Sequence, residues 1–270
     1  MVQLLQQGKD SIINDKVFYT EEENSMWSQL YEKQIEILKN RVHEHFFELL
    51  EELSLPKDRV PQLYEVSNTL RNKTGWTITR VDGLIPYNDF FGLLANKVFP
   101  STVYLRTLDK FSKDPDIFHE LFGHCPMLLD QNYSIFLNNL AKFALSCSKL
   151  EQLLVQRLLW FTIEVGLIQT NRGLKIYGGA LLSSSQESIY ALEENQSEKK
   201  RFDLLDIFRS PYRADVLQTT YYFINDFDTL YNIELSSQKL YNLSKMAIKL
   251  GEYPAKFDIE YNKYTSVHCF

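Results

Sequence analysis

The most informative stretch of the sequence is Asp116-Ile117-Phe118-His119-Glu120-Leu121-Phe122-Gly123-His124. It is similar in outline to the zinc-protease motif His-Glu-x-x-His, in which the two histidines stand four residues apart on one helix face. Here the spacing is five residues, which places the two side chains about 140° apart on an ideal α-helix. His119 and His124 can therefore share a metal ion only if the helix departs from ideal geometry, which Gly123 and Pro126 would permit. The spacing weakens the zinc-protease interpretation.

A third ligand is suggested by Glu164, the single carboxylate in the apolar stretch 159–167. Burying a lone carboxylate is costly unless it has a partner, and a metal ion would be such a partner. Two histidines and one carboxylate form a facial triad, the arrangement that non-haem Fe(II) uses with oxygen. From spacing alone the alternative stays open that the histidines are packed or surface residues and that Glu164 faces solvent.

Composition narrows the class of protein. The chain has 270 residues, 44% of them hydrophobic, and a formal net charge of −6. The negative charge argues against a nucleic-acid or anionic-membrane partner, since both attract basic patches. The sequence has no run of about 18 apolar residues, and its first residues lack the features of a signal peptide. Three cysteines without a pair spacing complete the prediction of a reduced, cytoplasmic protein.

Hydrophobic periodicity predicts a mainly α protein with a few short β-strands, folded as a single domain over residues 1–270 with residues 1–20 as a loose N-terminal arm. A capping box at Thr20 and Glu23 starts the first helix. A second helix follows Pro61. The other helices are predicted at 87–96, from 115, at 132–147, 150–169, 186–194, 226–232 and 236–249. Short strands are predicted at 76–81, 101–106, 174–177 and 221–223.

Several ordered motifs resemble the pterin-dependent aromatic amino acid hydroxylases over roughly residues 18 to 265. They are Glu21–Trp27, Arg80–Ile85, His119–Pro126, Trp160–Glu164 and Leu181–Ser184. In size the chain is closest to the bacterial phenylalanine 4-hydroxylases, which consist of the catalytic domain alone. The resemblance implies the catalytic-domain fold of that family, without its regulatory or tetramerisation segments. It also implies a monomer or homodimer.

The resemblance further implies a monooxygenase that uses Fe(II), O2 and a tetrahydropterin to hydroxylate L-phenylalanine to L-tyrosine, with separate enzymes recycling the pterin. The implied iron ligands are His119, His124 and Glu164. The implied pterin contacts are Gly83, Leu84, Ile85, Phe90 and Glu120. The implied substrate contacts are Arg106 for the carboxylate, Pro115 and Trp160 for the ring, and Ser183 near the substrate and an iron-ligand histidine, with Asp116 orienting Arg106 or a ligand histidine.

The chain also departs from the family pattern. Leu159 stands where a tyrosine is usual, and the family's Tyr-Gly-Ala-Gly reads Tyr-Gly-Gly-Ala at 177–180. The segment from Arg106 to His119 is two residues short. These changes affect the shape of the pocket, so tryptophan or tyrosine remains an alternative substrate. A zinc hydrolase and a binding protein without catalytic activity are alternatives of other classes.

Overall fold

The computed structural model describes residues 16–107, 115–193, 197–257 and 268–269, and is mainly helical, as the sequence predicts. Its α-helices are α2 (Glu21–Leu38), α3 (Glu44–Leu53), α4 (Leu63–Thr74), α5 (Tyr87–Ala95), α6 (Gln131–Ser146), α7 (Lys149–Leu159), α8 (Gly179–Ser183), α9 (Ser185–Glu193), α10 (Leu204–Arg209), α11 (Asp228–Tyr231) and α12 (Gln238–Leu250). Three further helical segments have other geometries: the π-helices η2 (His119–His124) and η4 (Trp160–Glu164), and the 3-10 helix η3 (Met127–Leu129).

The β-structure falls into three small units. The strands are β1 (Thr77–Arg80), β2 (Ile85–Pro86), β3 (Val98–Ser101), β4 (Leu167–Thr170), β5 (Gly173–Ile176), β6 (Glu198–Arg201), β7 (Thr220–Ile224) and β8 (His268–Cys269). The largest sheet has the order β5-β4-β7-β6, in which β4 and β5 are antiparallel while β7 is parallel to both β4 and β6. Strand β1 pairs with β3 in parallel, and β2 pairs with β8 in antiparallel.

The first helix begins where the sequence predicts. Thr20 accepts a hydrogen bond from the backbone N–H of Glu23, and the Glu23 side chain bonds back to the backbone of Thr20. The residues just before this cap are anchored as well, because the Tyr19 hydroxyl donates to the carbonyl of Val103 at 2.9 Å. The first 15 residues of the predicted arm lie outside the described residues.

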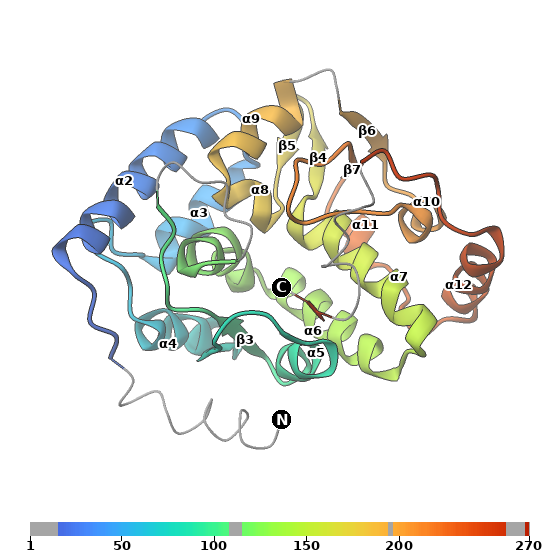
Figure 1. Cartoon of the computed structure of the whole chain (residues 1–270), viewed down its shortest axis with the longest axis horizontal. Coiled ribbons are helices and arrows are strands. Elements are labelled where there is room, and N and C mark those ends of the chain that lie inside the picture. The colour runs from blue at the N-terminus through green and yellow to red at the C-terminus, as the bar shows by residue number, and fades with distance from the viewer. Residues whose placement is uncertain (1–15, 108–114, 194–196, 258–267, 270) are drawn as a thin grey trace.

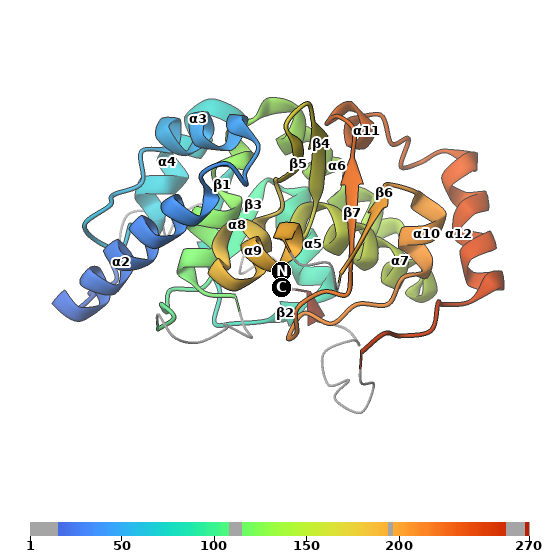
Figure 2. The ribbon, with the colours of Figure 1, turned by 90° about the horizontal axis from the view of Figure 1, so that it is seen from above.

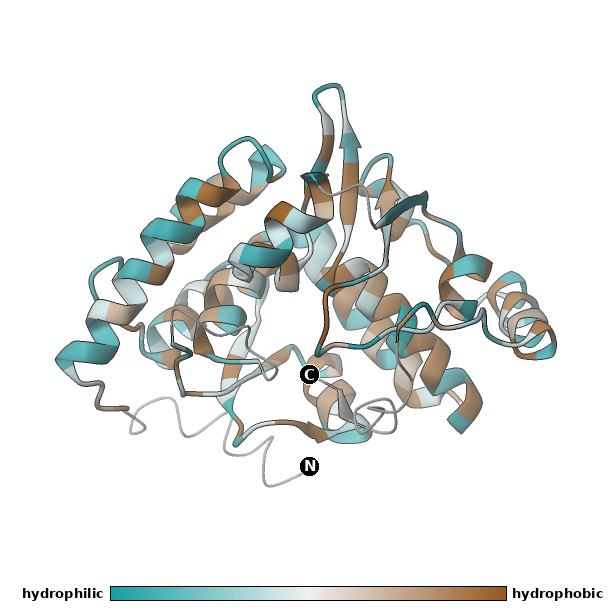
Figure 3. Ribbon diagram, turned by 45° about the horizontal axis from the view of Figure 1, so that its top comes forward, coloured by the Kyte–Doolittle hydropathy of each residue, from teal (hydrophilic) through white to brown (hydrophobic). Residues whose placement is uncertain are grey.

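The main hydrophobic core runs from the N-terminal helices through α5, α6 and the sheet to α10 and α12. Figures 1 and 2 show α2, α3 and α4 on one side of the molecule, α7, α10 and α12 on the other, and α6 between them. In Figure 3 the tip of the β4–β5 hairpin and much of α2 are hydrophilic, whereas the segments toward the centre are more hydrophobic. In the part of the chain that the structure describes, no helix is long and apolar enough to cross a membrane.

Two predicted elements are wrong in extent. The predicted helix 150–169 ends at Glu164, and residues Leu167–Thr170 form strand β4. Gly166 marks the break, because a Cβ there would lie 2.2 Å from the Tyr177 ring and from the carbonyl oxygen of Thr162. The predicted strand 101–106 lies earlier, at Val98–Ser101, and the chain continues from it without regular structure. The elements that were not predicted are α3, η3, α8, α10 and the strands β2, β6 and β8.

Candidate active site

Three donor atoms converge inside the protein. The Nε2 atoms of His119 and His124 lie 3.1 Å apart. The Oε2 atom of Glu164 lies 3.1 Å from Nε2 of His124 and 3.8 Å from Nε2 of His119. All three side chains are buried. The structure therefore brings together the three residues that the sequence proposes as metal ligands.

The five-residue spacing of the histidines is explained by the helix type. Residues His119–His124 form the π-helix η2, in which Cys125 donates its backbone N–H to the carbonyl of Glu120, five residues earlier. This bonding pattern widens the turn, so residues i and i+5 lie near one face, which an α-helix would not allow. The sequence analysis predicts a departure from ideal geometry here, and the structure identifies it as a π-helix.

Glu164 is delivered by a second π-helix. Segment η4 (Trp160–Glu164) continues directly from α7, and Val165 donates its backbone N–H to the carbonyl of Trp160 at 2.9 Å. The π-helix ends at Glu164, just before Gly166 and strand β4. Both ligand-bearing segments thus have the same unusual geometry, which is often found at functional sites.

The tautomer of His119 follows from its neighbour Ser183. The Ser183 hydroxyl has one proton, which it donates to the carbonyl of Gly179 at 3.0 Å. With its proton directed to Gly179, the same hydroxyl accepts at the 2.9 Å contact with Nδ1 of His119, an arrangement that assigns the ring proton to Nδ1 by the hydrogen-bond network. Nε2 of His119 is then unprotonated and presents its lone pair to Glu164 and His124. Metal-binding histidines are commonly oriented in this way, by a hydrogen bond from the ring nitrogen that does not bind the metal.

The electrostatics of the cluster suit a cation. Burial and the neighbouring His124 lower the pKa of His119 to about 3, so its imidazole is neutral. Burial raises the pKa of Glu164, but its attraction to His124 and His119 outweighs this and the net pKa is lowered. Burial, with Glu164 and Asp116 nearby, raises the pKa of Glu120 well above its usual value. A neutral imidazole and an ionised carboxylate are the protonation states that bind metals.

A metal ion fits this donor set. Ligands about 2.1 Å from an ion and on adjacent octahedral corners lie about 3 Å from one another, close to the separations seen here. The lone pairs of His119 and Glu164 would repel each other at this distance without a cation between them. Glu120 also has a carboxylate oxygen within 4.8 Å of the two imidazoles. Because its raised pKa favours the neutral acid, Glu164 is the better third ligand.

The ring of His124 packs closely against Gly179. A Cβ atom on Gly179 would lie 2.2 Å from Cε1 and 2.5 Å from Nδ1 of the His124 ring, so the alanine that the family usually has at this position would require the ring or α8 to shift. Helix α8, which begins at Gly179, packs against η2. The departure from the family pattern at 177–180 therefore falls directly behind a proposed ligand.

Arg106 and Asp116 form a buried ion pair beside the cluster. The guanidinium donates from Nε to Oδ1 of Asp116 at 2.8 Å, its Nη2 contacts the same oxygen, and its Nη1 donates to the carbonyl of Ser183 at 3.1 Å. Asp116 also accepts from the backbone N–H of His119 at 3.0 Å and of Arg106 at 2.7 Å. The sequence predicts that Asp116 orients either Arg106 or a ligand histidine, and its hydrogen bonds reach both residues.

A narrow cavity adjoins the cluster. It is lined by Phe90, Leu94, Phe99, His119, Glu120, His124, Leu137, Leu159, Ile163 and Glu164. Phe90 and Glu120, both predicted pterin contacts, therefore share a cavity with the proposed ligands. Leu159, the departure from the family's tyrosine, lines it too. Some predicted pterin and substrate contacts do not line this cavity, namely Gly83, Leu84, Ile85, Pro115 and Trp160. Gly83–Ile85 precede α5, and Pro115 and Trp160 directly precede Asp116 and Phe161 in the chain.

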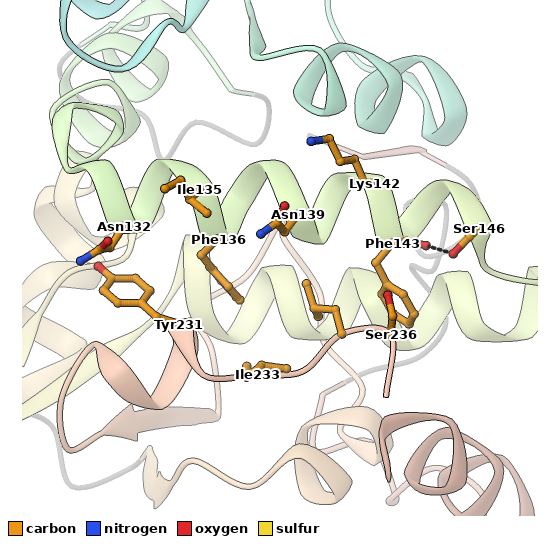
Figure 4. A pocket seen from close by; sticks show the side chains of 11 residues that line it. Asn132, Ile135, Phe136, Asn139, Lys142, Phe143, Ser146, Tyr231, Ile233 and Ser236 are labelled. Atoms are coloured by element: carbon orange, nitrogen blue, oxygen red, sulfur yellow. Dashed lines mark hydrogen bonds between the residues drawn. The ribbon is translucent and has the colours of Figure 1, made fainter. Parts of the chain in front are cut away.

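A larger pocket lies elsewhere, along α6. Its volume is about 520 Å³, and it opens between α6 and the segment from Tyr231 to Ser236. Figure 4 shows Asn132, Phe136 and Asn139 of α6 on one side and Tyr231 and Ile233 on the other. No predicted site residue lines it. The donor geometry, and not pocket size, locates the chemistry at the buried cluster.

Three residues that support the site were not predicted from the sequence: Gly179, Glu187 and Gln218. The Gly-Gly pair before Ala180 was the available signal for Gly179. Nothing in the local sequence marks Glu187 and Gln218, because their importance comes from contacts between distant segments.

The fold and the cluster together define a mainly helical protein with a buried two-histidine, one-carboxylate centre. A sequence model of the biopterin-dependent aromatic amino acid hydroxylases matches residues 6–268. The chain is 37% identical over 246 residues to a phenylalanine-4-hydroxylase of Pseudomonas aeruginosa, covering 90% of this chain and 93% of the relative. The chain belongs to the biopterin-dependent aromatic amino acid hydroxylase family.

Solved structures agree. The apo structure of the cold-active phenylalanine hydroxylase from Colwellia psychrerythraea matches with a TM-score of 0.85 and 38% identity, covering 91% of this chain and 95% of that one. A phenylalanine hydroxylase from Chromobacterium violaceum, solved with iron(III) and 7,8-dihydrobiopterin, matches with a TM-score of 0.82 and 35% identity, covering 87% and 85%. The predicted fold class and family are therefore confirmed.

Proposed function

We propose that this chain is an Fe(II)- and tetrahydropterin-dependent monooxygenase that hydroxylates L-phenylalanine to L-tyrosine with O2. The observation that carries the proposal is the convergence of two imidazoles and one carboxylate within 3.1–3.8 Å in a buried site. Similarity to proteins named phenylalanine-4-hydroxylase supports the substrate. Family membership argues against the zinc hydrolase alternative.

His119, His124 and Glu164 hold the iron in this proposal. Bound Fe(II) supplies the activation of O2, with the tetrahydropterin as the source of the two further electrons. The protein contributes a fixed donor geometry: Ser183 holds the tautomer of His119, and Gly179 leaves room for the ring of His124. Burial of all three ligands keeps water from most of the centre.

Arg106 binds the carboxylate of the amino acid. Its guanidinium has five N–H donors, of which the contacts to Asp116 and Ser183 use three, leaving donors for an incoming carboxylate. Asp116 fixes the plane of the guanidinium, so the remaining donors are already oriented. Pro115 and Trp160 form the walls for the substrate ring, and Ser183 lies at the junction between Arg106 and His119.

The pterin lies against Phe90, with Glu120 and the backbone of Gly83, Leu84 and Ile85 as its polar contacts. Phe90 is buried on α5 and faces the same cavity as Glu120 and the proposed ligands, so a flat ring stacked on it would lie close to the iron. Gly83 has a positive φ of 109°, a conformation that glycine adopts without strain, and this lets the backbone turn before Leu84.

Tryptophan or tyrosine is the alternative substrate. Leu159 replaces a tyrosine hydroxyl at the cavity wall by an alkyl group, and a change of this size alters discrimination by about 1–3 kcal/mol. The single catalytic domain, the monomer or homodimer state, the cytoplasmic location and the separate pterin-recycling enzymes are further parts of the proposal.

The deciding experiment combines metal analysis with product analysis. We expect the purified protein to bind about one iron and to form tyrosine from phenylalanine only when O2 and a tetrahydropterin are both supplied. Parallel reactions with tryptophan and tyrosine test the substrate. Hydroxylation of tryptophan without tyrosine formation from phenylalanine would contradict the substrate assignment. Zinc-dependent activity that needs neither O2 nor pterin would contradict the whole proposal.

A further inference from the structure

The indole ring of Trp160 is held from outside the active site by the loop that follows α10. Tyr212 stacks on the indole with ring centroids 4.8 Å apart and an interplanar angle of 14°. Gln218, at the end of the same loop, accepts a hydrogen bond from Nε1 of Trp160 at 3.0 Å through its side-chain oxygen. Trp160 and Gln218 are 58 residues apart in the chain, so this contact ties η4 to the start of β7.

Gln218 has no freedom to turn away from the indole. Its side-chain nitrogen donates to the carbonyl of Arg213 at 2.6 Å and to that of Val216 at 2.7 Å. Both amide protons are thereby used, which assigns the oxygen to the side facing Trp160. The side chain is only 4% exposed. Because its neighbours are carbonyl groups on one side and an N–H group on the other, a flipped amide would lose all three bonds.

Glu187 of α9 holds Gln218 in turn. Its Oε1 atom accepts from the backbone N–H of Gln218 at 3.2 Å and from the hydroxyl of Tyr221 at 2.9 Å. Glu187 is buried, and a buried carboxyl without a cation is costly unless hydrogen bonds compensate for it. Here the compensating donors lie on the segment that fixes Trp160.

We propose that Gln218 is a positioning residue that sets the plane of the Trp160 indole, and that Glu187 holds Gln218 in place. This inference rests on the proposed function in one respect, namely that Trp160 forms a wall for the substrate ring. The reacting ring must lie at a defined angle and distance from the iron, and small displacements reduce rates strongly. Releasing the indole edge therefore weakens ring placement while leaving the iron ligands untouched.

The test is a double-mutant cycle between Gln218→Leu and Trp160→Phe. Leucine removes the acceptor, together with the donors to the Arg213 and Val216 carbonyls, and phenylalanine removes the indole N–H donor. We expect Gln218→Leu alone to lower kcat/KM for phenylalanine roughly five- to tenfold, as for loss of one buried hydrogen bond. It should also lower the yield of tyrosine per pterin oxidised. In the Trp160→Phe background the same substitution should have little further effect, because the donor is already gone.

Conservative substitutions separate positioning from folding. Glu187→Gln keeps a carbonyl oxygen that can accept from both Gln218 and Tyr221, so it should retain the tyrosine yield, whereas Glu187→Leu should behave like Gln218→Leu. Gln62→Leu is the matched control. Gln62 is also a buried glutamine whose amide bonds to backbone groups, those of Val17, away from Trp160. It should lower the melting temperature without changing the tyrosine yield per pterin.

Three results of the turnover measurements would overturn the inference: additive effects in the cycle, an unchanged tyrosine yield in Gln218→Leu, or equal losses of yield in Gln218→Leu and Gln62→Leu. The near-ultraviolet circular dichroism of Trp160, obtained as the difference between wild type and Trp160→Phe, gives a readout that needs no turnover. An unchanged Trp160 signal in Gln218→Leu would also contradict the inference. Failure of the wild type to make tyrosine would instead contradict the proposed function, with the indole signal still reporting on Gln218.

Discussion

The two π-helices of the site have the same wide turn but carry different functional groups. Segment η2 (His119–His124) places the two proposed metal donors on one face, and its neighbours Asp116, Ser183 and Gly179 all lie against those histidines. Segment η4 (Trp160–Glu164) carries a single donor at its last residue and the indole of Trp160 at its first. Segment η2 therefore serves the proposed metal site and, through Glu120, the proposed pterin site, whereas η4 joins the metal site to the proposed substrate wall.

This difference predicts which function a substitution in each helix would affect. A disturbance in η2 should remove iron and, with it, all chemistry. A disturbance at the start of η4 should leave iron in place and change how the substrate ring is held. Glu164 is the exception in η4, because it belongs functionally to the cluster formed by η2. The following predictions test this division, from the largest expected effect to the smallest.

The largest effect should come from removing a ligand. His119→Ala, His124→Ala or Glu164→Ala should abolish both iron retention and tyrosine formation, because two donors cannot hold the ion in a facial site. Iron per protein, measured by metal analysis, and tyrosine formation check this, with Trp160→Phe as a comparison that should keep its iron. An alanine variant at any of the three positions with full iron and activity would disprove the ligand assignment.

The next effect concerns the glycine behind His124. Gly179→Ala, which introduces the residue usual in the family but leaves Ala180 in place, should weaken iron binding by about tenfold, the lower end of the range for changes to groups that orient metal ligands. The added Cβ would lie 2.2 Å from the ring and must displace it. Metal titration of the apoprotein measures the affinity. Ala180→Gly, at the next position, removes a methyl group instead of adding one and should bind iron normally. Unchanged affinity in Gly179→Ala would mean that α8 can shift away from η2.

Arg106 should separate substrate binding from metal binding. Arg106→Ala should lower kcat/KM for phenylalanine by roughly a hundredfold, since truncating one partner of a buried charge pair costs about 2–5 kcal/mol. Arg106→Lys keeps the charge but loses the planar fork, so it should recover activity only in part. Iron content should stay near that of the wild type in both. Loss of iron would assign Arg106 a structural role, exerted through Asp116 on the backbone N–H of His119.

Local sequence carried most of the information on η2 and much less on the segments around η4. The five-residue spacing, Gly123 and Pro126 together indicated a distorted helix, and the structure shows a π-helix there. Helix 150–169 was predicted too long because the apolar run continues through Leu167 and Ile168, which suit a buried strand equally well. Only the packing of Gly166 against Tyr177 decides where the helix ends.

Other elements could not be found from local patterns. Strand β6, Glu198–Arg201, consists entirely of charged residues and has no alternation, yet it pairs in parallel with β7 at the edge of the sheet. The hydrogen bond between Trp160 and Gln218 joins residues far apart in sequence, so no window around either residue reveals it. Resemblance to a family supplied the site residues, but contacts made only in the fold explain how they are held.

The smallest effect on activity is expected from a pH dependence of stability that arises behind η4. Burial raises the pKa of Glu187 to about 7, although its hydrogen bonds from Tyr221 and Gln218 oppose the shift. Among the described residues, those that shift the pKa of Glu187 include no cation. Burial and Glu187 itself raise the pKa of Tyr221, which stays neutral, and Tyr190 lies beside Tyr221. In the unfolded chain Glu187 should titrate near 4.5, the ordinary value for a glutamate.

Between these two pKa values the folded protein binds more protons at Glu187 than the unfolded chain does. The contribution of Glu187 to the free energy of unfolding is therefore present in full below pH 4.5, falls as pH rises toward 7, and is constant above that. The pKa difference corresponds to roughly 3 kcal/mol. Glu187→Gln cannot ionise but can accept the same two hydrogen bonds, so its stability relative to wild type should rise between pH 5 and pH 8. Urea unfolding of both proteins across this range measures the difference.

Glu151→Gln is the control. Glu151 caps α7, and its bonds to Ser148 lower its pKa, so this variant should not reproduce the rise. If the difference in free energy of unfolding between Glu187→Gln and wild type did not change with pH, Glu187 would titrate alike in the folded and unfolded chains. The contacts that hold Trp160 at the start of η4 would then be no more sensitive to pH than the proposed ligand Glu164 at its end.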